Sequence, residues 1–85
     1  MIYTYHPERF KEMRHKLNIK QRDLATILGS TVVTVQNYES GRREPNGYVV
    51  EVLHRLCREQ KIPYQSLYDI PHNLISLLPQ HRRPK

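Results

Sequence analysis

The amino-acid sequence predicts an all-α fold, a compact domain of four to five helices. Two observations predict this class. Apolar residues recur at intervals of three and four positions along successive segments, which is the period of an amphipathic helix. The intervals between these segments hold glycine, asparagine or proline, the residues that end helices. The length of 85 residues is that of one domain with one small core.

The first 19 residues predict a short strand or an arm, followed by a helix. Apolar and aromatic residues alternate within residues 1–5, a pattern that fits either a short strand or an arm. We expect the helix to start at Pro7, since proline suits the first helical position. Its buried face consists of Phe10, Met13 and Leu17. The helix is expected to break at Asn18-Ile19.

Two short helices follow, over residues 21–28 and from residue 31 to about 39. Ala25 is small enough for a close approach, Gly29 is free to take the positive φ of a sharp corner, and Val35 supplies a locking contact. Two helices that cross tightly through a short turn need these three features. This is the spacing of a helix-turn-helix, whose second helix can enter the major groove of DNA.

A fourth helix is predicted from a cap at Asn46 to about Glu59. Its wide apolar stripe consists of Val49, Val50, Val52, Leu53, Leu56 and Cys57. A stripe of this width indicates a helix that packs against the rest of the domain.

The pattern after Pro63 is weaker. There, Tyr64, Leu67 and Tyr68 fit one helical turn, and Pro71 fits the start of a fifth helix. The apolar residues of that helix are Leu74, Ile75, Leu77 and Leu78. This cluster either forms a dimer interface or packs on the fourth helix of its own subunit, and both interpretations stay open.

We therefore expect one helix-turn-helix domain over residues 1–79 and a basic flexible tail over residues 80–85. Within the domain, residues 10–59 form the core of the motif and residues 62–79 are a possible dimerisation region.

The formal charge of +6 and a pI of about 9.8 predict an anionic partner, with a merely soluble surface as the alternative. Cys57 is the only cysteine, which excludes an intrachain disulfide, and its place in the apolar stripe indicates a core residue. The sequence has no apolar run of about 18 residues and no charged-then-apolar leader. We expect an intracellular, cytoplasmic protein with no membrane partner.

A set of residues between Phe10 and Pro45 follows the sequence pattern of a known family. It consists of Phe10, Arg14, Leu17, Gln21, Leu24, Ala25, Leu28, Gly29, Thr31, Thr34, Val35, Tyr38, Glu39, Gly41, Arg42 and Pro45. Through this set, residues 10–59 resemble the helix-turn-helix domains of the lambda-repressor and Cro superfamily, the XRE-type regulators. The segment TVQNYESGRREPNGYVVEVLHRL is similar to the antitoxin (HigA-like) branch, whose members are paired with small ribonuclease-type toxins. The resemblance implies a lambda-repressor-like fold and sequence-specific DNA binding.

Polar residues at the helix starts and in the glycine turn are candidate phosphate contacts. They are Gln21, Thr31, Thr34, Arg42 and Arg43. Gln21 lies where the second helix begins, so its amide and the free backbone N–H groups can meet a phosphate. Thr31 does the same for the third helix, with a cap alone as the alternative. The resemblance implies that both are phosphate clamps. The two arginines can straddle a phosphate or reach the minor groove, or are simply solvated.

The outward side of the third helix holds the candidate base contacts. They are Val32, Val33, Gln36 and Asn37, which face outward if Val35 and Tyr38 face the core. The two amides can bond the N6/N7 edge of adenine, and a valine can touch a thymine methyl group. In the alternative interpretation one valine belongs to the core. We expect Asn37 to be the main base reader.

The remaining polar residues indicate a structural ion pair and no metal-binding or catalytic site. Arg14 and Glu39 match positions that pair in the superfamily, so the resemblance implies a structural ion pair. The histidines, which are His6, His15, His54, His72 and His81, show no metal-ligand spacing with Cys57. The sequence holds no glycine-rich phosphate loop, nucleophile signature or carboxylate pair, so we expect neither catalysis nor a cofactor.

The leading functional hypothesis is a repressor that binds a palindromic double-stranded operator as a homodimer, because one reading helix covers only a few base pairs. An antitoxin would also bind a small toxin protein, whereas a phage or plasmid regulator would bind DNA alone. The resemblance over residues 34–45 favours the antitoxin. Two other functions stay open: a protein-interaction module with only weak DNA binding, and a nonspecific nucleic-acid binder driven by the basic tail.

Overall fold

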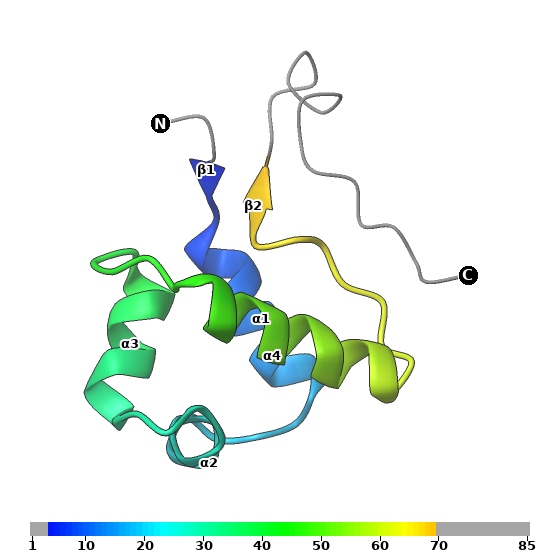
Figure 1. Ribbon diagram of the computed structural model, residues 1–85, viewed down its shortest axis with the longest axis horizontal. Coiled ribbons are helices and arrows are strands. Elements are labelled where there is room, and N and C mark those ends of the chain that lie inside the picture. Colours follow the sequence, from blue (N-terminus) through cyan, green and yellow to red (C-terminus); the bar gives the residue numbers. More distant parts are fainter. Residues whose placement is uncertain (1–3, 70–85) are drawn as a thin grey trace.

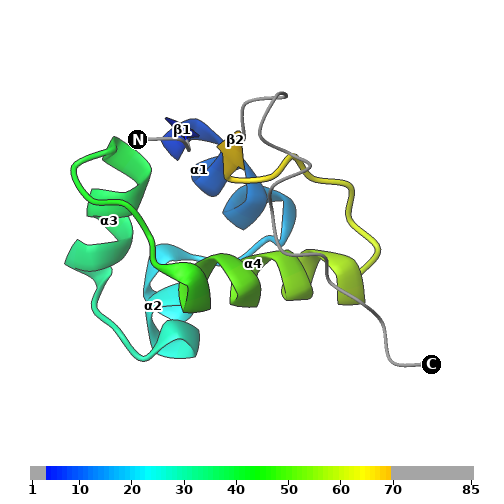
Figure 2. The same ribbon diagram turned by 45° about the horizontal axis from the view of Figure 1, so that its top comes forward.

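The computed structural model describes residues 4–69. In this range the chain forms four helices, α1 (Pro7–Lys16), α2 (Gln21–Leu28), α3 (Val32–Ser40) and α4 (Gly47–Glu59). Two short strands, β1 (Thr4–Tyr5) and β2 (Tyr68–Asp69), flank them. The all-α class is confirmed, and the strands lie together at the edge of the molecule opposite α2 (Figures 1 and 2).

All four helices contribute to one apolar core. Its fully or almost fully buried members are Phe10, Met13, Leu17, Leu24, Ala25, Leu28, Val35, Tyr38, Val49, Leu53, Cys57 and Leu67. The rings of Phe10 and Tyr38 have centroids 5.3 Å apart, which joins α1 to α3. Burial of a large apolar side chain contributes about 1.5–3 kcal/mol, so this cluster accounts for the stability of helices that are too short to form alone.

The corner between α2 and α3 has the three features predicted from the sequence. Gly29 caps α2 with φ 68°, in the left-handed region where a side chain is strained. Ala25 is 3% exposed and Val35 is fully buried, so the small residue and the locking residue both lie in the contact between the helices. Thr31 then caps α3 by accepting the N–H of Thr34 at 3.2 Å.

The start of α4 also confirms the prediction. The side chain of Asn46 accepts the backbone N–H of Val49 at 3.0 Å and so satisfies one of the free donors of the first turn. The helix ends at Glu59, and Lys61 turns the chain with φ 57°.

The predicted helical turn at Tyr64, Leu67 and Tyr68 is wrong. Residues 62–67 contain no helical turn, and β2 pairs antiparallel with β1, with Tyr5 opposite Tyr68. The physical reason is long-range: an extended chain carries Leu67 into the core, where it is fully buried. The backbone N–H of His6 donates to the Leu67 carbonyl at 2.9 Å and fixes this position.

Several predictions lie outside the described residues. These are the fifth helix, the Leu74–Leu78 cluster, residues 70–79 of the possible dimerisation region, the tail at 80–85, and His72 and His81. The described part of that region, residues 62–69, packs against its own domain through Leu67. None of the helices in residues 4–69 has the length and apolar character that crossing a membrane requires.

Candidate nucleic-acid interface

The outward side of α3 is a mixture of apolar and amide side chains. Val33 is 62% exposed and Gln36 is exposed, whereas Asn37 is half-buried. Val32 is also half-buried and packs against the core, so only part of it faces outward. The interpretation that placed a valine partly in the core therefore applies to Val32 and not to Val33. An isolated valine as exposed as Val33 is compatible with thymine-methyl contact.

The N-terminal end of α3 presents two threonine hydroxyl groups. The hydroxyl groups of Thr31 and Thr34 lie 3.1 Å apart, and Thr31 is exposed while Thr34 is half-buried. The bond between them uses one of the two O–H donors, so one hydroxyl remains free to donate to a phosphate. This end of the helix therefore combines free backbone N–H groups with hydroxyl groups, as a phosphate contact requires.

Gln21 at the start of α2 is held by two partners. Its amide nitrogen donates to a Glu39 oxygen at 3.0 Å, and its carbonyl oxygen accepts from the Gln36 amide at 3.3 Å. The sequence did not indicate either contact, because Gln36 and Glu39 lie 15 and 18 positions after Gln21. One of the two N–H groups of the Gln21 amide has no partner among residues 4–69, so it can still donate to a phosphate.

Glu39 connects this amide pair to the core. The Arg14 Nε donates to a Glu39 oxygen at 2.6 Å and its Nη2 to the other at 3.3 Å. The side chains of Arg14 and Glu39 are 10% and 6% exposed. Arg14 also donates to the Ile19 carbonyl at 3.0 Å. This is the ion pair expected from the resemblance, and it links α1, α2 and α3.

The turn after α3 carries the two candidate arginines. Gly41 caps α3 with φ 84°. Beyond it, the Arg43 N–H donates to the Asn37 carbonyl at 3.2 Å, and the Arg43 guanidinium carbon lies 6.0 Å from the centroid of the Tyr38 ring. That distance allows a cation–π contact. Arg42 is exposed and has no side-chain partner within the part of the chain that the structure describes.

Two further cations lie beside Gln21. Lys20 and Arg22 line an open depression of about 290 Å³ together with Gln21 and Val32. Both cations are exposed, and the depression places them next to the candidate phosphate contact. Neither cation is among the phosphate contacts predicted from the sequence. Their positions directly before and after Gln21 were the available signal, because phosphate sites gather cations around a helix start.

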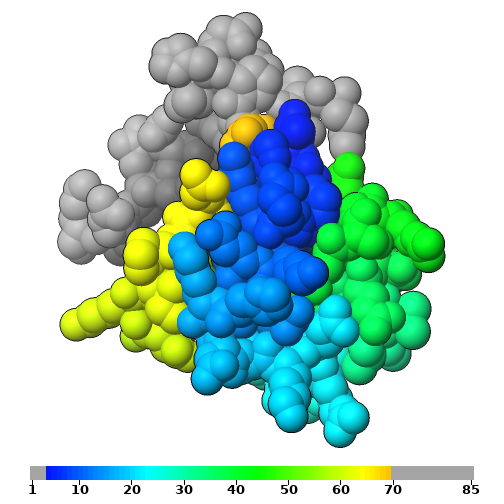
Figure 3. Space-filling model, turned by 180° about the vertical axis from the view of Figure 1, so that it is seen from behind, coloured from blue at the N-terminus to red at the C-terminus, as the bar shows by residue number. Residues whose placement is uncertain are grey.

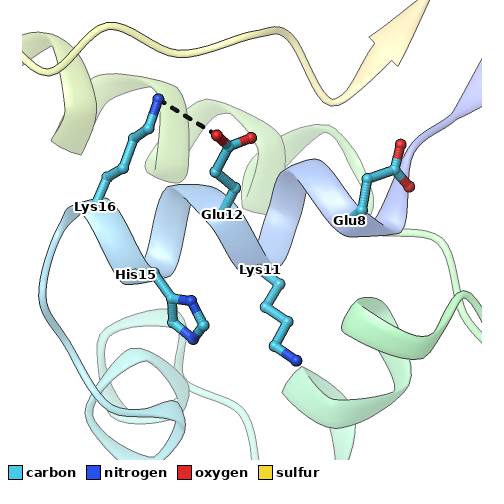
Figure 4. Close-up of a pocket in the computed structure, with 5 residues that line it drawn as sticks. All are labelled: Glu8, Lys11, Glu12, His15 and Lys16. Atoms are coloured by element: carbon cyan, nitrogen blue, oxygen red, sulfur yellow. Dashed lines mark ion pairs between the residues drawn. The ribbon is translucent and has the colours of Figure 1, made fainter.

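A second depression is lined by side chains of both charges. It has a volume of about 410 Å³ and is lined by residues of α1 alone, Glu8, Lys11, Glu12, His15 and Lys16. Figure 4 shows Lys16 and Glu12 directed toward each other, with 3.6 Å between their charged atoms. Two carboxylates among the cations make this face a poor anion site, so the candidate interface does not extend onto this face of α1.

The described residues show no built metal or nucleophile site. In residues 4–69 no group of three histidine, cysteine or acidic side chains converges on a common point. Burial raises the pKa of the Cys57 thiol and lowers the pKa of His54, so both stay uncharged at neutral pH. The His54 ring packs on Tyr64, with centroids 4.8 Å apart.

Comparison with known families gives one match. The model of the HTH_3 family, described as helix-turn-helix, matches residues 10–60, which is more than half of the chain and covers α1 from Phe10 onward and all of α2, α3 and α4. Searches of the curated proteins and of the solved structures found no significant match.

Proposed function

Since the chain belongs to the HTH_3 helix-turn-helix family and is thus a DNA-binding transcription regulator, we propose that it is a repressor. In this proposal it binds a palindromic operator as a homodimer, with α3 in the major groove, and acts in the cytoplasm. The observation that carries the proposal is the continuous surface formed by α3, the start of α2 and the loop after α3.

Contacts between the candidate residues support one surface rather than separate patches. The amides of Gln36 and Gln21 are 3.3 Å apart, and Gln21 shares a depression with Lys20, Arg22 and Val32. On the other side, the backbone bond from Arg43 to Asn37 attaches the arginine pair to α3. The proposed base contacts therefore lie between two pairs of cations, Lys20 with Arg22 and Arg42 with Arg43.

This order matches what duplex recognition needs. The cations grip the phosphates on the two sides of a groove, and they fix the register of the protein without reading sequence. The amides of Gln36 and Asn37 and the methyl groups of Val33 are then presented to the base edges. We propose Val32, Val33, Gln36 and Asn37 as base contacts. The proposed phosphate contacts are Gln21, Thr31, Thr34, Arg42 and Arg43, with Lys20 and Arg22 added.

The size of the reading helix supports the homodimer. A helix of nine residues is only about 13 Å long, so one protomer reads a few base pairs. Two half-sites about one DNA turn apart, ~34 Å, give the specificity that a genome requires. A dimer surface within residues 70–79 stays a prediction from the Leu74–Leu78 cluster.

We also propose a biological role for this regulator, that of an antitoxin. The residues from Thr34 to Pro45 resemble the antitoxin branch, which favours an autoregulator that also binds a small toxin. A phage or plasmid regulator without a toxin is the alternative. The product of the neighbouring gene distinguishes them: copurification of a small ribonuclease-like protein with this chain supports the antitoxin, and its absence supports the alternative.

The experiment that tests the proposal is hydroxyl-radical footprinting on the duplex upstream of the gene, with the protein–DNA stoichiometry measured by sedimentation. We expect two protected half-sites one turn apart and two protomers on each duplex. Protection of a single half-site by one protomer would disprove the homodimer. Uniform protection along the duplex would disprove the specific operator.

A further inference from the structure

We propose that the β1–β2 ribbon positions the arginine loop for DNA, and that Tyr5 and Tyr68 are its two positioning residues. The arginine loop is residues 41–46. The inference rests on the proposed function, in which Arg42 and Arg43 hold the phosphate backbone. Both tyrosines lie outside residues 10–60, the part of the chain that the family model matches.

Tyr5 contacts the last turn of α3, directly before the loop begins. Its hydroxyl donates to the Tyr38 carbonyl at 2.7 Å, and the same oxygen accepts the N–H of Gly41 at 3.3 Å. Pro7 lies close to Gly41, since a Cβ built on that glycine would be 3.3 Å from the Pro7 Cγ. The N-terminal segment therefore fixes the glycine corner from which the arginines start.

Tyr68 contacts the loop where it enters α4. Its hydroxyl donates to the Pro45 carbonyl at 2.8 Å. Pro45 is buried, and the next residue, Asn46, caps α4. The Tyr68 hydroxyl thus holds the second end of the loop. It bonds to a backbone oxygen, so changes to the side chains of the loop would not remove the bond.

The two anchors belong to one unit. Tyr5 and Tyr68 are opposite each other in the β1–β2 pairing, and their ring centroids are 5.3 Å apart. Asp69 secures the ribbon to α1 through Arg9 at 2.8 Å and His6 at 2.6 Å. Figure 3 shows the blue N-terminal segment between the green loop region and the orange end of β2. One ribbon therefore sets the distance between the two ends of the arginine loop.

Both phenols keep the proton that these bonds need. Burial raises the pKa of the Tyr5 phenol and the pKa of the Tyr68 phenol, so each hydroxyl remains a donor well above neutral pH. A loop fixed at both ends loses less conformational freedom when its arginines bind DNA, and the ordering cost that is avoided strengthens binding.

A double-mutant cycle on the full-length protein tests the inference. Tyr68→Phe and Tyr5→Phe each delete one hydroxyl and keep the ring. Operator affinity is measured for each in the native background and in an Arg42→Ala/Arg43→Ala background. We expect each change to weaken binding about three- to tenfold in the native background, from the loss of preorganisation. We expect less than about a twofold effect when both arginines are absent.

The matched control is Tyr64→Phe, which deletes a hydroxyl bonded to Arg58 at 3.3 Å and should leave affinity unchanged. An equal loss in both backgrounds would overturn the inference, because the tyrosines would then act elsewhere. So would unchanged affinity of Tyr5→Phe and Tyr68→Phe in the native background. If the Arg42→Ala/Arg43→Ala protein binds the operator as well as the native protein, the proposed function of the loop fails instead.

Discussion

The side-chain amide of Gln36 on α3 donates a hydrogen bond to the amide oxygen of Gln21 at the first position of α2, over 3.3 Å. Gln21 donates in turn to Glu39, whose carboxylate is paired with Arg14. A proposed base contact and a proposed phosphate contact are thus joined to a buried ion pair. This network fixes the orientation of the Gln36 amide before DNA binds, which is what bidentate recognition of adenine needs.

Asn37→Ala should reduce binding to the operator and spare nonspecific binding. An amide that reads a base contributes about 1–3 kcal/mol of discrimination, so we expect the ratio of operator to random-duplex affinity to fall by about 5- to 150-fold. Fluorescence anisotropy with both duplexes at one salt concentration measures this ratio. Equal losses on the two duplexes would show that Asn37 does not read bases.

Arg42→Ala should weaken binding to every duplex. Loss of one phosphate contact lowers the slope of log affinity against log salt by about one unit for each bound protomer. The matched control is Lys61→Gln, because Lys61 follows the end of α4 that lies far from α3 (Figures 1 and 2). An Arg42→Ala slope equal to that of the control would remove Arg42 from the phosphate contacts.

Glu39→Ala should destabilise the domain strongly. It leaves the Arg14 charge, whose side chain is 10% exposed, without its partner, and loss of one member of a buried pair costs about 3–5 kcal/mol. The control is Glu51→Ala, because Glu51 pairs with Arg55 and Arg58 on the exposed side of α4 and surface pairs contribute less than about 1 kcal/mol. Urea unfolding measures both. Similar losses of stability for the two variants would show that the Arg14–Glu39 pair is not buried in solution.

Asp69 should make stability depend on acid pH. Hydrogen bonds from Arg9 and then His6 lower the pKa of the Asp69 carboxyl below its usual value of 3.8. A lowered folded-state pKa means that the stabilisation is complete above that usual value and is lost as the pH falls through the lower, folded-state pKa. The free energy of unfolding of Asp69→Asn should therefore lie below that of the native protein at pH 7 and pH 5, and the two should converge in stronger acid. A constant difference across this range would contradict the pairing of Asp69.

The sequence predicted the elements whose signals are local. The bounds of α2, the left-handed cap at Gly29 and the cap at Asn46 all depend on residues within one or two turns, and the structure confirms them. A short strand was one of the two interpretations of residues 1–5, and β1 lies there. The strand β2 and its pairing with β1 were missed for the opposite reason. The strand β2 has two residues, too few to show a period, and the pairing joins Tyr5 to Tyr68 across the whole domain.

For the candidate interface, the sequence predicted which residues face outward but not how they contact one another. The outward direction of Val33 and Gln36 follows from helical spacing once Val35 and Tyr38 are assigned to the core. Contacts between helices do not follow from spacing, so the bond from Gln21 to Glu39 and the contact of Arg43 with Tyr38 needed the structure. They change the interpretation of Gln21 from an isolated clamp to one member of a network.

The most direct test is the affinity ratio between a selected duplex and a scrambled duplex of equal length. The duplex is enriched from a random pool by the full-length protein, and binding is measured near physiological salt. We predict a palindromic consensus and a ratio of about 10³ or more, lost in a variant with Gln36→Ala and Asn37→Ala. A ratio near one, or a high ratio that this variant retains, would contradict base reading by α3.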